Sequence, residues 1–269
     1  MSTAERLMGK ASARRGERVL GWLALAALTG SAILSLIVSP PDAEQGNLVR
    51  LMYVHVPAAW VAYLSFGVVF VASVAYLKTN KTRWDRLGAA SAEIGVLFTA
   101  LTIVLGSIWA KPVWGTWWTW DPRLTTTAIL LLIYVGYLAV RRLPDSPARR
   151  ARWAAVVGIV GFIDVPIVHQ SVRWWRSLHQ APARLLGVPD IAPVMGAALG
   201  VGFLAFTILY LYLMAVRLRV GRLEDRVVAE ALSPRLGQPA DALLEEAEGL
   251  AAPRSEPVGA RPNEVPARG

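Results

Sequence analysis

Residues 52–77 read MYVHVPAAWVAYLSFGVVFVASVAYL, a run of 26 residues without Asp, Glu, Lys or Arg. A helix needs about 20 apolar residues to cross the hydrocarbon core of a bilayer, so this run is long enough to span a membrane. Five more runs are nearly as free of charge: 19–38, 87–110, 124–140, 153–168 and 191–216. Because no alternating strand pattern is present and backbone groups in lipid must be paired within the chain, the sequence predicts an all-α polytopic membrane protein, a bundle of six transmembrane helices.

The composition agrees with a membrane protein and excludes several other classes. Hydrophobic residues make up 55% of the chain and charged residues 17%, whereas soluble domains carry about 25% charged residues, which argues against a soluble enzyme. No cysteine is present, which excludes disulfides, thiolate metal sites and cysteine nucleophiles. The net charge of +9 comes from basic residues beside the apolar runs, a pattern typical of orientation signals, so no nucleic-acid partner is expected.

The distribution of Lys and Arg predicts how the chain faces. The N-terminal segment, the second and fourth loops and the C-terminal segment carry 22 of them, and the other three loops carry 6. Basic loops stay inside, so we expect both termini in the cytoplasm. The first run is followed by Ser39-Pro40-Pro41-Asp42 rather than a cleavage site, and we interpret it as a retained helix.

This topology predicts three parts of the chain. Residues 1–18 form a cytoplasmic N-terminus, residues 19–216 the six-helix domain, and residues 217–269 a cytoplasmic tail. The tail is expected to be largely disordered, with short amphipathic helices to about residue 232 and over 240–250, because beyond residue 251 it offers little apolar area to offset the entropy of ordering.

The outward loops carry the unusual chemistry, above all a tryptophan-rich loop. Five of the 11 tryptophans fall within residues 109–120: Trp109, Trp114, Trp117, Trp118 and Trp120. Two interpretations stay open: an aromatic belt at the membrane interface, or a platform for a large flat apolar ligand. The pair Asp121-Pro122 predicts a helix start directly below the loop, with the carboxylate as N-cap and proline at the first helical position.

All three histidines lie on or near the same outer face. His55 is at the outer end of the second run, just before Pro57. His179 follows Trp175 by four residues, so we expect the two to share one face of a helix. His169 is about 80° away from His179 on such a helix and is the third candidate. Neutral imidazoles suit haem iron, whereas zinc is less well supported because only three histidines exist.

Charged residues on this face and within the spans are further candidates. Arg123, Arg173 and Arg176 could meet haem propionates, or they could contact lipid phosphates instead. Two acids, Glu93 and Asp164, lie within spans and should face the interior of the bundle. Asp164 is placed to orient a histidine or an arginine, and Glu93 is expected to serve packing or a contact at a helix end.

Four strings of sequence carry a family resemblance: YVHVPAAW (53–60), WAKPVW (109–114), WGTWWTWD (114–121) and SVRWWRSLHQ (171–180). The third resembles the tryptophan-rich motif of the haem-handling membrane proteins of cytochrome c biogenesis. Together with six spans, the four strings are similar to the haem exporter protein C family, also called cytochrome c maturation protein C. The resemblance covers residues 19–216.

The resemblance implies a function and a set of residues. It implies a bacterial inner-membrane protein, not an enzyme, that binds haem b at its periplasmic face and delivers it to a periplasmic haem chaperone. Its expected partners are ABC transporter subunits, a small membrane subunit of the same complex, and membrane lipid. Carried over by position, the axial iron ligands are His55 and His179, whereas His169 matches a position that is not a ligand. The haem platform falls on Trp114, Trp117, Trp118, Trp120 and Asp121.

The chain departs from the family pattern at two places and leaves two other classes open. Proline stands at position 122, and the tail after Arg217 is longer than expected. A membrane electron carrier with haem b would stack histidine pairs inside its spans, whereas His55 and His179 lie at one edge. A transporter of another solute would need more polar groups in the bundle than Glu93 and Asp164. No nucleotide-binding motif is found, so any coupling to ATP must come from a partner.

Overall fold

A computed structural model describes residues 3–143, 146–179 and 192–249 of the chain, and every regular element in these ranges is a helix. The elements are α1 (Thr3–Ile33) with the π turn η1 (Leu34–Val38), the 3-10 turn η2 (Asn47–Leu51), α2 (Met52–Thr79), α3 (Thr82–Trp114), α4 (Pro122–Val140), α5 (Pro147–Phe162), α6 (Asp164–Trp174), α7 (Pro193–Leu236) and α8 (Ala240–Gly249). Six stretches are long and apolar enough to cross a membrane: Arg15–Val38, Asn47–Thr79, Thr82–Trp114, Pro122–Val140, Pro147–Trp174 and Pro193–Leu236. The predicted all-α bundle of six spans is confirmed.

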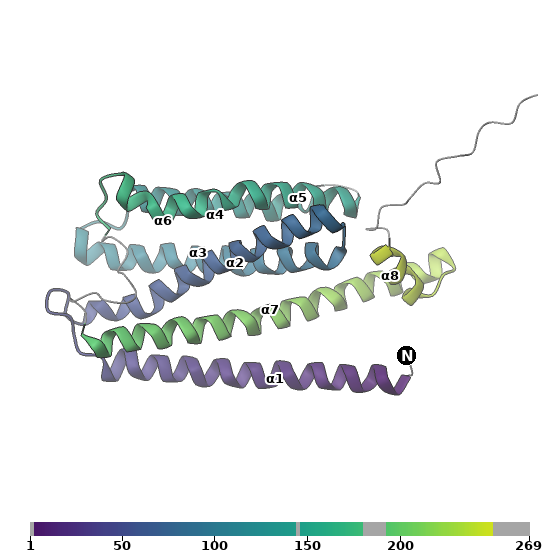
Figure 1. The fold of residues 1–269 in the computed structure, drawn as a ribbon, viewed down its shortest axis with the longest axis horizontal. Helices are drawn as coiled ribbons and strands as arrows, with labels where there is room; N and C mark the ends of the chain where they lie inside the picture. Colours follow the sequence, from purple (N-terminus) through teal and green to yellow (C-terminus); the bar gives the residue numbers. More distant parts are fainter. Residues whose placement is uncertain (1–2, 144–145, 180–191, 250–269) are drawn as a thin grey trace, which may run out of the picture.

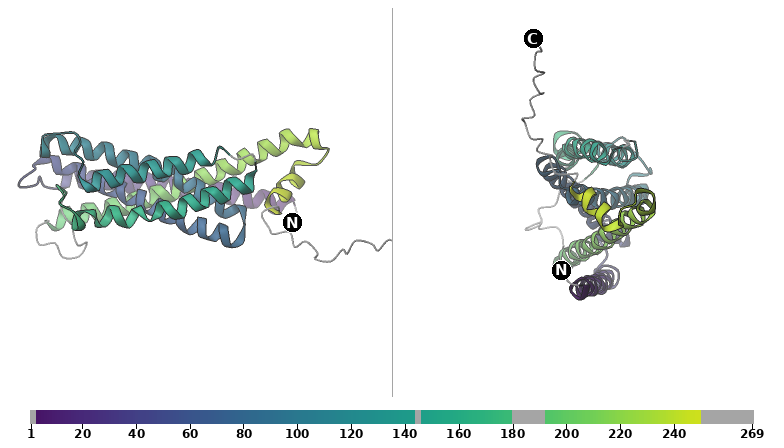
Figure 2. Two further views of the ribbon diagram at one scale, coloured as in Figure 1. Left: turned by 90° about the horizontal axis from the view of Figure 1, so that it is seen from above. Right: turned by 90° about the vertical axis from the view of Figure 1, so that its right-hand side faces the viewer.

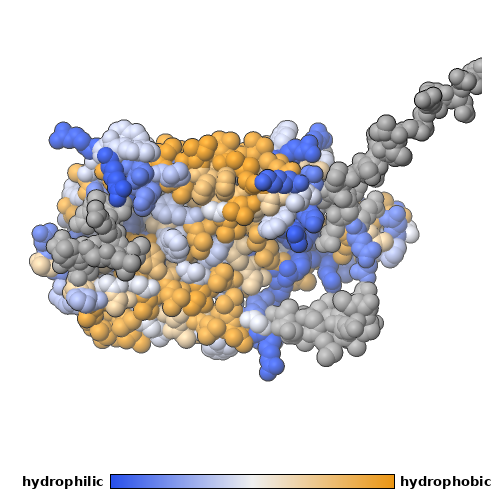
Figure 3. Space-filling view, viewed as in Figure 1, coloured by the Kyte–Doolittle hydropathy of each residue, from blue (hydrophilic) through white to orange (hydrophobic). Residues whose placement is uncertain are grey.

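The helices run side by side along one long axis (Figure 1). Helices α2 and α3 occupy the middle, α4 to α6 cover one side, and α7 and α1 lie on the other. Seen along the axis, α1 lies at the edge of the bundle, beside α7 (Figure 2). On the face shown in Figure 3, a broad apolar band covers the middle and hydrophilic residues gather at both ends, as expected for a chain that crosses a bilayer.

Small residues let the central helices approach closely. Phe66 of α2 stacks on Tyr134 of α4 with ring centroids 3.6 Å apart. A Cβ added to Gly95 of α3 would lie 2.6 Å from Cε1 of Phe66, so only glycine leaves room for this aromatic pair. In lipid, where apolar surface alone does not drive helices together, such close packing is a main source of helix association.

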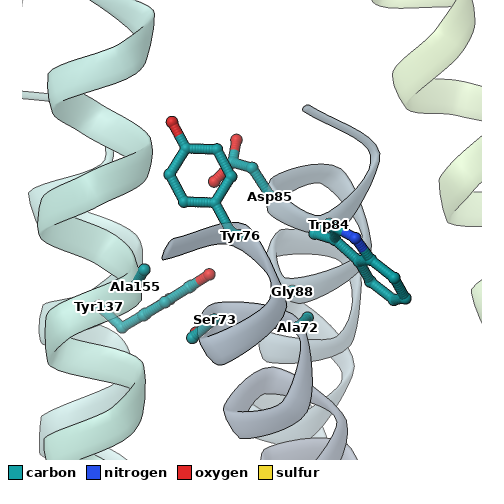
Figure 4. A pocket seen from close by; sticks show the side chains of 8 residues that line it. All are labelled: Ala72, Ser73, Tyr76, Trp84, Asp85, Gly88, Tyr137 and Ala155. Carbon is teal, nitrogen blue, oxygen red and sulfur yellow. The ribbon is translucent and has the colours of Figure 1, made fainter. Parts of the chain in front are cut away.

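Ion pairs tie the spans together at the end of the bundle where α2 turns into α3. Arg141 donates two hydrogen bonds to Asp85, of 2.5 and 2.8 Å. Burial lowers the pKa of Arg141, but the hydrogen bonds and the charge of Asp85 outweigh this and raise it. Beside this pair, Tyr76, Asp85 and Tyr137 line a small cavity (Figure 4) that leaves no room for a water molecule. The pair therefore fixes α3 against α4 at a closely packed site.

The two acids within the spans behave differently. Glu93 of α3 pairs with Arg217 of α7, whose Nη2 donates to Glu93 Oε1 at 2.9 Å, so this acid links two helices. Asp164 is buried, and its Oδ2 atom has no hydrogen-bond partner among the described residues. The expectation that Asp164 orients a histidine or an arginine is therefore not met in that part of the chain.

Helix continues into the C-terminal segment, as the sequence predicted, and ends only four residues beyond the expected position near residue 232. Helix α7 continues without a break to Leu236, and α8 begins at Ala240 and packs against it. Two ion pairs fix the first turns of this extension to other helices: Arg86 of α3 with Asp225 at 2.9 Å, and Glu17 of α1 with Arg219 at 2.9 Å. The disorder expected beyond residue 251 lies outside the described residues.

Candidate functional site

Three connecting segments, residues 39–46, 115–121 and 175–179, meet at the end of the bundle opposite α8 (Figure 1). Trp109 donates its indole N–H to Gln45 Oε1 at 2.8 Å, which joins α3 to the first of them. Arg123 Nη2 donates to the carbonyl oxygen of His169 at 3.3 Å, which joins α4 to α6. The aromatic, basic and histidine residues predicted for the outer loops thus gather at one end.

His55 lies in the first turns of α2 and packs against α3. Its ring meets the indole of Trp109 edge to face, with centroids 5.9 Å apart. A Cβ added to Gly106 would lie 3.0 Å from Cε1 of His55, so glycine at this position lets the imidazole lie against the helix. The Nδ1 atom of His55 is buried and has no hydrogen-bond partner within the described ranges. The ring therefore carries a buried nitrogen that the described residues leave unpaired.

Asp121 holds His179 through a set of hydrogen bonds. Its Oδ1 accepts the backbone N–H of Arg123 at 3.0 Å and lies 3.2 Å from Nδ1 of His179. Its Oδ2 accepts the hydroxyl of Ser177 at 2.8 Å and the N–H of Leu178 at 2.7 Å. The carboxylate thus caps α4, as predicted, and also fixes a segment more than 50 residues away. With Nδ1 facing the carboxylate, Nε2 is the ring nitrogen of His179 that remains to bind a ligand.

The charges in this cluster follow from burial and hydrogen bonding. Burial would raise the pKa of Asp121, but hydrogen bonds from Leu178, Ser177 and Arg123 and the proximity of His179 bring it below its ordinary value. Burial lowers the pKa of His179, and the cation of Arg123 adds to this against the opposing effect of Asp121. At neutral pH the site therefore holds an ionised carboxylate beside a neutral imidazole, the form of histidine that binds a metal ion.

The prediction that Trp175 and His179 share a helical face is wrong. Helix α6 ends at Trp174, and Trp175 is extended, with φ −127° and ψ 160°. In a continuing helix the N–H of Leu178 would bond to the carbonyl of Trp174, whereas here it bonds to Asp121. The position of His169 relative to His179 therefore cannot be taken from helical rotation. His169 is an exposed residue of α6 and enters the cluster through its carbonyl oxygen.

The tryptophan loop begins at Gly115, whose φ of 77° ends α3 in a left-handed turn that glycine adopts without strain. Trp114 packs edge to face on His179, with centroids 4.9 Å apart. Trp118 packs in the same manner against Trp120, with centroids 5.8 Å apart. Trp117 and Trp120 are 57% and 82% exposed. Trp109 and Trp114, expected in the loop, thus belong to α3, and Trp114 supports the histidine from the end of that helix. The loop itself presents the indole rings of Trp117 and Trp120 to the surroundings.

The three candidate arginines differ in their surroundings. Arg123 is half-buried beside Asp121, and its Nε atom is buried without a partner among the described residues. Arg173 and Arg176 are exposed at the end of α6 and beyond it. Arg123 is therefore the cation that the fold places next to His179, and Arg173 and Arg176 lie at the exposed edge of the cluster.

Sequence reasoning missed three contributors to the cluster. Gln45, Gly106 and Ser177 each contact a candidate residue. Each partner is distant along the chain, so no spacing within a single sequence identifies them.

The arrangement suits a flat metal macrocycle with acidic substituents. Nε2 is the ring nitrogen of His179 that does not face Asp121, and Nδ1 of His55 has no hydrogen-bond partner among the described residues. Indole rings provide area for stacking, and Arg123 provides a cation for a carboxylate. Fold and site together define a polytopic helical membrane protein with an aromatic and histidine-containing binding surface at one end of its bundle.

The comparisons with known proteins agree with this class. The profile of the family described as "Heme exporter protein C" matches residues 3–233. The "Heme exporter protein C" of Bradyrhizobium diazoefficiens is 40% identical over 213 residues, which are 78% of this chain and 81% of that protein. Those of Escherichia coli K12 and Haemophilus influenzae are each 37% identical, over 74% and 83% of this chain and 81% and 89% of their own lengths. The chain belongs to the haem exporter protein C family.

Proposed function

We propose that this protein handles haem for cytochrome c maturation, binding haem b between His55 and His179 at the periplasmic end of the bundle and passing it to a periplasmic haem chaperone. The observation that carries the proposal is the bond between Asp121 and Nδ1 of His179, which leaves Nε2 of a neutral imidazole free for iron. Membership of the haem exporter protein C family supports the cargo.

Each group has a task in holding the cargo. His55 and His179 come from α2 and from the segment after α6, so two separate elements supply the axial ligands. The platform for the porphyrin is formed by Trp114, Trp117, Trp118 and Trp120. Asp121, as the cap of α4, fixes the position where this platform joins the helix. Arg123 pairs with one propionate, and the exposed Arg173 and Arg176 assist at the rim.

The position of the site favours transfer over electron transport across the membrane. An electron carrier needs haems on both sides of the bilayer, whereas His55 in the first turns of α2 and His179 in the segment after α6 lie at the same end of the bundle. Trp117 and Trp120 remain exposed there, so a partner can reach the edge of a bound porphyrin. We propose that the protein acts within a complex with ABC transporter subunits and a small membrane subunit, which supply the coupling to ATP.

Labelling of single cysteines tests the orientation. In this cysteine-free chain, Glu44→Cys lies at the proposed periplasmic end and Ala148→Cys at the cytoplasmic end, and both positions are exposed. A membrane-impermeant maleimide should label Glu44→Cys in intact spheroplasts and Ala148→Cys only after lysis. Labelling of Ala148→Cys alone in intact spheroplasts would overturn the proposed topology.

Removal of two tryptophans tests transfer. Stacking contributes about 0.5 to 1.5 kcal/mol per aromatic pair beyond area burial, so loss of Trp117 and Trp118 together should weaken haem retention only moderately. We expect the chaperone to receive less haem than the residual occupancy of the variant allows, because the surface facing the partner is lost. If chaperone loading falls only in proportion to bound haem, the loop serves binding and not transfer.

A further inference from the structure

A groove separate from the haem-handling surface lies between α1 with its π turn, the start of α2, and α7. Its volume is about 210 Å³. Tyr53 and Val54 of α2 line it, whereas the next residue, His55, packs on the other side against Gly106 and Trp109 of α3. The groove therefore belongs to a different face of α2 and needs its own account.

One end of the groove is polar and incompletely bonded. Ser35 is only 4% exposed and lines the groove, and its hydroxyl has no hydrogen-bond partner among the described residues. Arg50 of η2 also lines it, and its Nε atom is buried without a partner there. A buried polar atom without a partner is unfavourable, so an acceptor bound in the groove would be stabilised by both Ser35 and Arg50.

The other end of the groove is apolar and lies deeper in the membrane. Ser35 is close to the outer end of the span Arg15–Val38, and Arg50 is close to the outer end of the span Asn47–Thr79. Leu28 lies seven residues before Ser35, about 10 Å further into the bilayer at 1.5 Å per residue. Phe206 of α7 also lines the groove, and Leu28 packs against the core cluster to which Phe206 belongs. The lining thus changes from a cation and a hydroxyl group near the outer end of the groove to hydrocarbon side chains deeper in the membrane.

We propose that this groove binds one anionic phospholipid, with its phosphate on Arg50 and Ser35 and an acyl chain along Leu28 and Phe206. A guanidinium matches a phosphate with two parallel hydrogen bonds, and the serine hydroxyl supplies a third donor. A cavity of 150 Å³ already holds a small hydrocarbon, so the observed volume is sufficient for part of an acyl chain. A partner's α-helix is about 10 Å in diameter, so a 10 Å length of it would occupy roughly 790 Å³, which is more than the groove can hold.

The bound lipid would hold in place the turn that precedes the proposed haem ligand His55. Arg50 lies in the turn that leads directly into α2, and His55 follows within the first turns of that helix. A phosphate bound to Arg50 would hold this turn against α1, which otherwise packs mainly on α7. The lipid itself is predicted from the groove alone and does not depend on the haem proposal.

Quantification of retained phospholipid tests the inference. The full-length protein is purified in detergent, washed extensively, and extracted for lipid mass spectrometry. We expect about one anionic phospholipid per chain, and a reduction of roughly tenfold in Arg50→Gln because a charge-assisted bond is lost. Ala32→Phe, which fills the groove, should have the same effect. Ala26→Phe is the matched control, because Ala26 is an exposed alanine of α1 outside the groove, and it should retain the lipid.

A second measurement keeps the test valid if a variant folds poorly. Vesicles that contain phosphatidylglycerol should raise the melting temperature of the wild type and of Ala26→Phe more than vesicles of phosphatidylcholine do. For Ala32→Phe the two kinds of vesicle should have the same effect. Equal retention in all variants would mean ordinary annular lipid and would overturn the proposal. The proposal would also be overturned if Arg50→Gln lost haem but kept its lipid. The same holds if Ala32→Phe lost co-purifying subunits but kept its lipid.

Discussion

Replacing Asp121 by Asn separates two tasks that the carboxylate performs. Asparagine is as good an N-cap as aspartate, so the start of α4 should be preserved. The amide has only one acceptor oxygen, whereas the carboxylate serves Arg123 and His179 with Oδ1 and Ser177 and Leu178 with Oδ2. Whichever way the amide is turned, its NH₂ group faces at least one of the groups that donate to the carboxylate in the wild type, and that hydrogen bond is lost.

The size of the effect follows from these contacts. A hydrogen bond to a charged group contributes about 1.5 to 3 kcal/mol, and a buried donor without a partner costs about 1 to 3 kcal/mol. The segment 175–179, which carries His179, should then be held against the start of α4 less tightly by a comparable free energy. We therefore expect haem affinity to fall about 5- to 150-fold, since 1.4 kcal/mol corresponds to a factor of ten.

Haem titration of the purified variant, followed in the Soret region, measures this change. Gel filtration and melting temperature show that the helix bundle is intact. Asp121→Ala, which also removes the cap at a further cost of about 1 kcal/mol, should be weaker still. Wild-type affinity and an unchanged spectrum in Asp121→Asn would refute the idea that this carboxylate positions His179.

Three further predictions concern other parts of the structure. Gly106→Val should displace His55 and reduce bound haem, whereas Gly136→Ala, at a site with open space, should not; equal haem content in both would contradict the packing argument. Asp85→Asn should lower the stability of the protein by about 3 to 5 kcal/mol, measured as a melting temperature, because it leaves a buried guanidinium without its counter-charge; an unchanged melting temperature would be contrary to this. Since the pKa of His179 lies below its usual 6.5, a proton should compete with iron only below that pH, so haem occupancy should stay constant down to pH 6.5 and then fall; a decline that begins above pH 7 would argue against a neutral, buried ligand.

Local signals in the sequence were sufficient for the spans and for the start of α4. Each span is recognised from its own length and polarity, and the cap of α4 from Asp121 and Pro122 alone. The gathering of the histidines and tryptophans at one end followed from the order of the spans, because alternate loops of a helical bundle meet at the same end.

Long-range contacts decided what the sequence could not show. The chain around residues 175–179 has a helical spacing, but Asp121 binds its backbone from 57 positions away and stops the helix. The ion pairs that fix the C-terminal part of α7 to α3 and α1 likewise join distant positions, so their partners cannot be recognised in one sequence. Ser35 and Arg50 lie on separate elements, so their groove has no local signature.

The absorption spectrum of single histidine variants tests the central claim most directly. We predict that the purified protein shows a low-spin spectrum with two imidazole ligands, and that His55→Ala and His179→Ala each lower haem content or give a five-coordinate form that added imidazole partly restores. His169→Ala should keep the wild-type spectrum, because its ring is exposed and only its carbonyl oxygen joins the cluster. Loss of haem in His169→Ala together with a normal spectrum in His179→Ala would contradict the account.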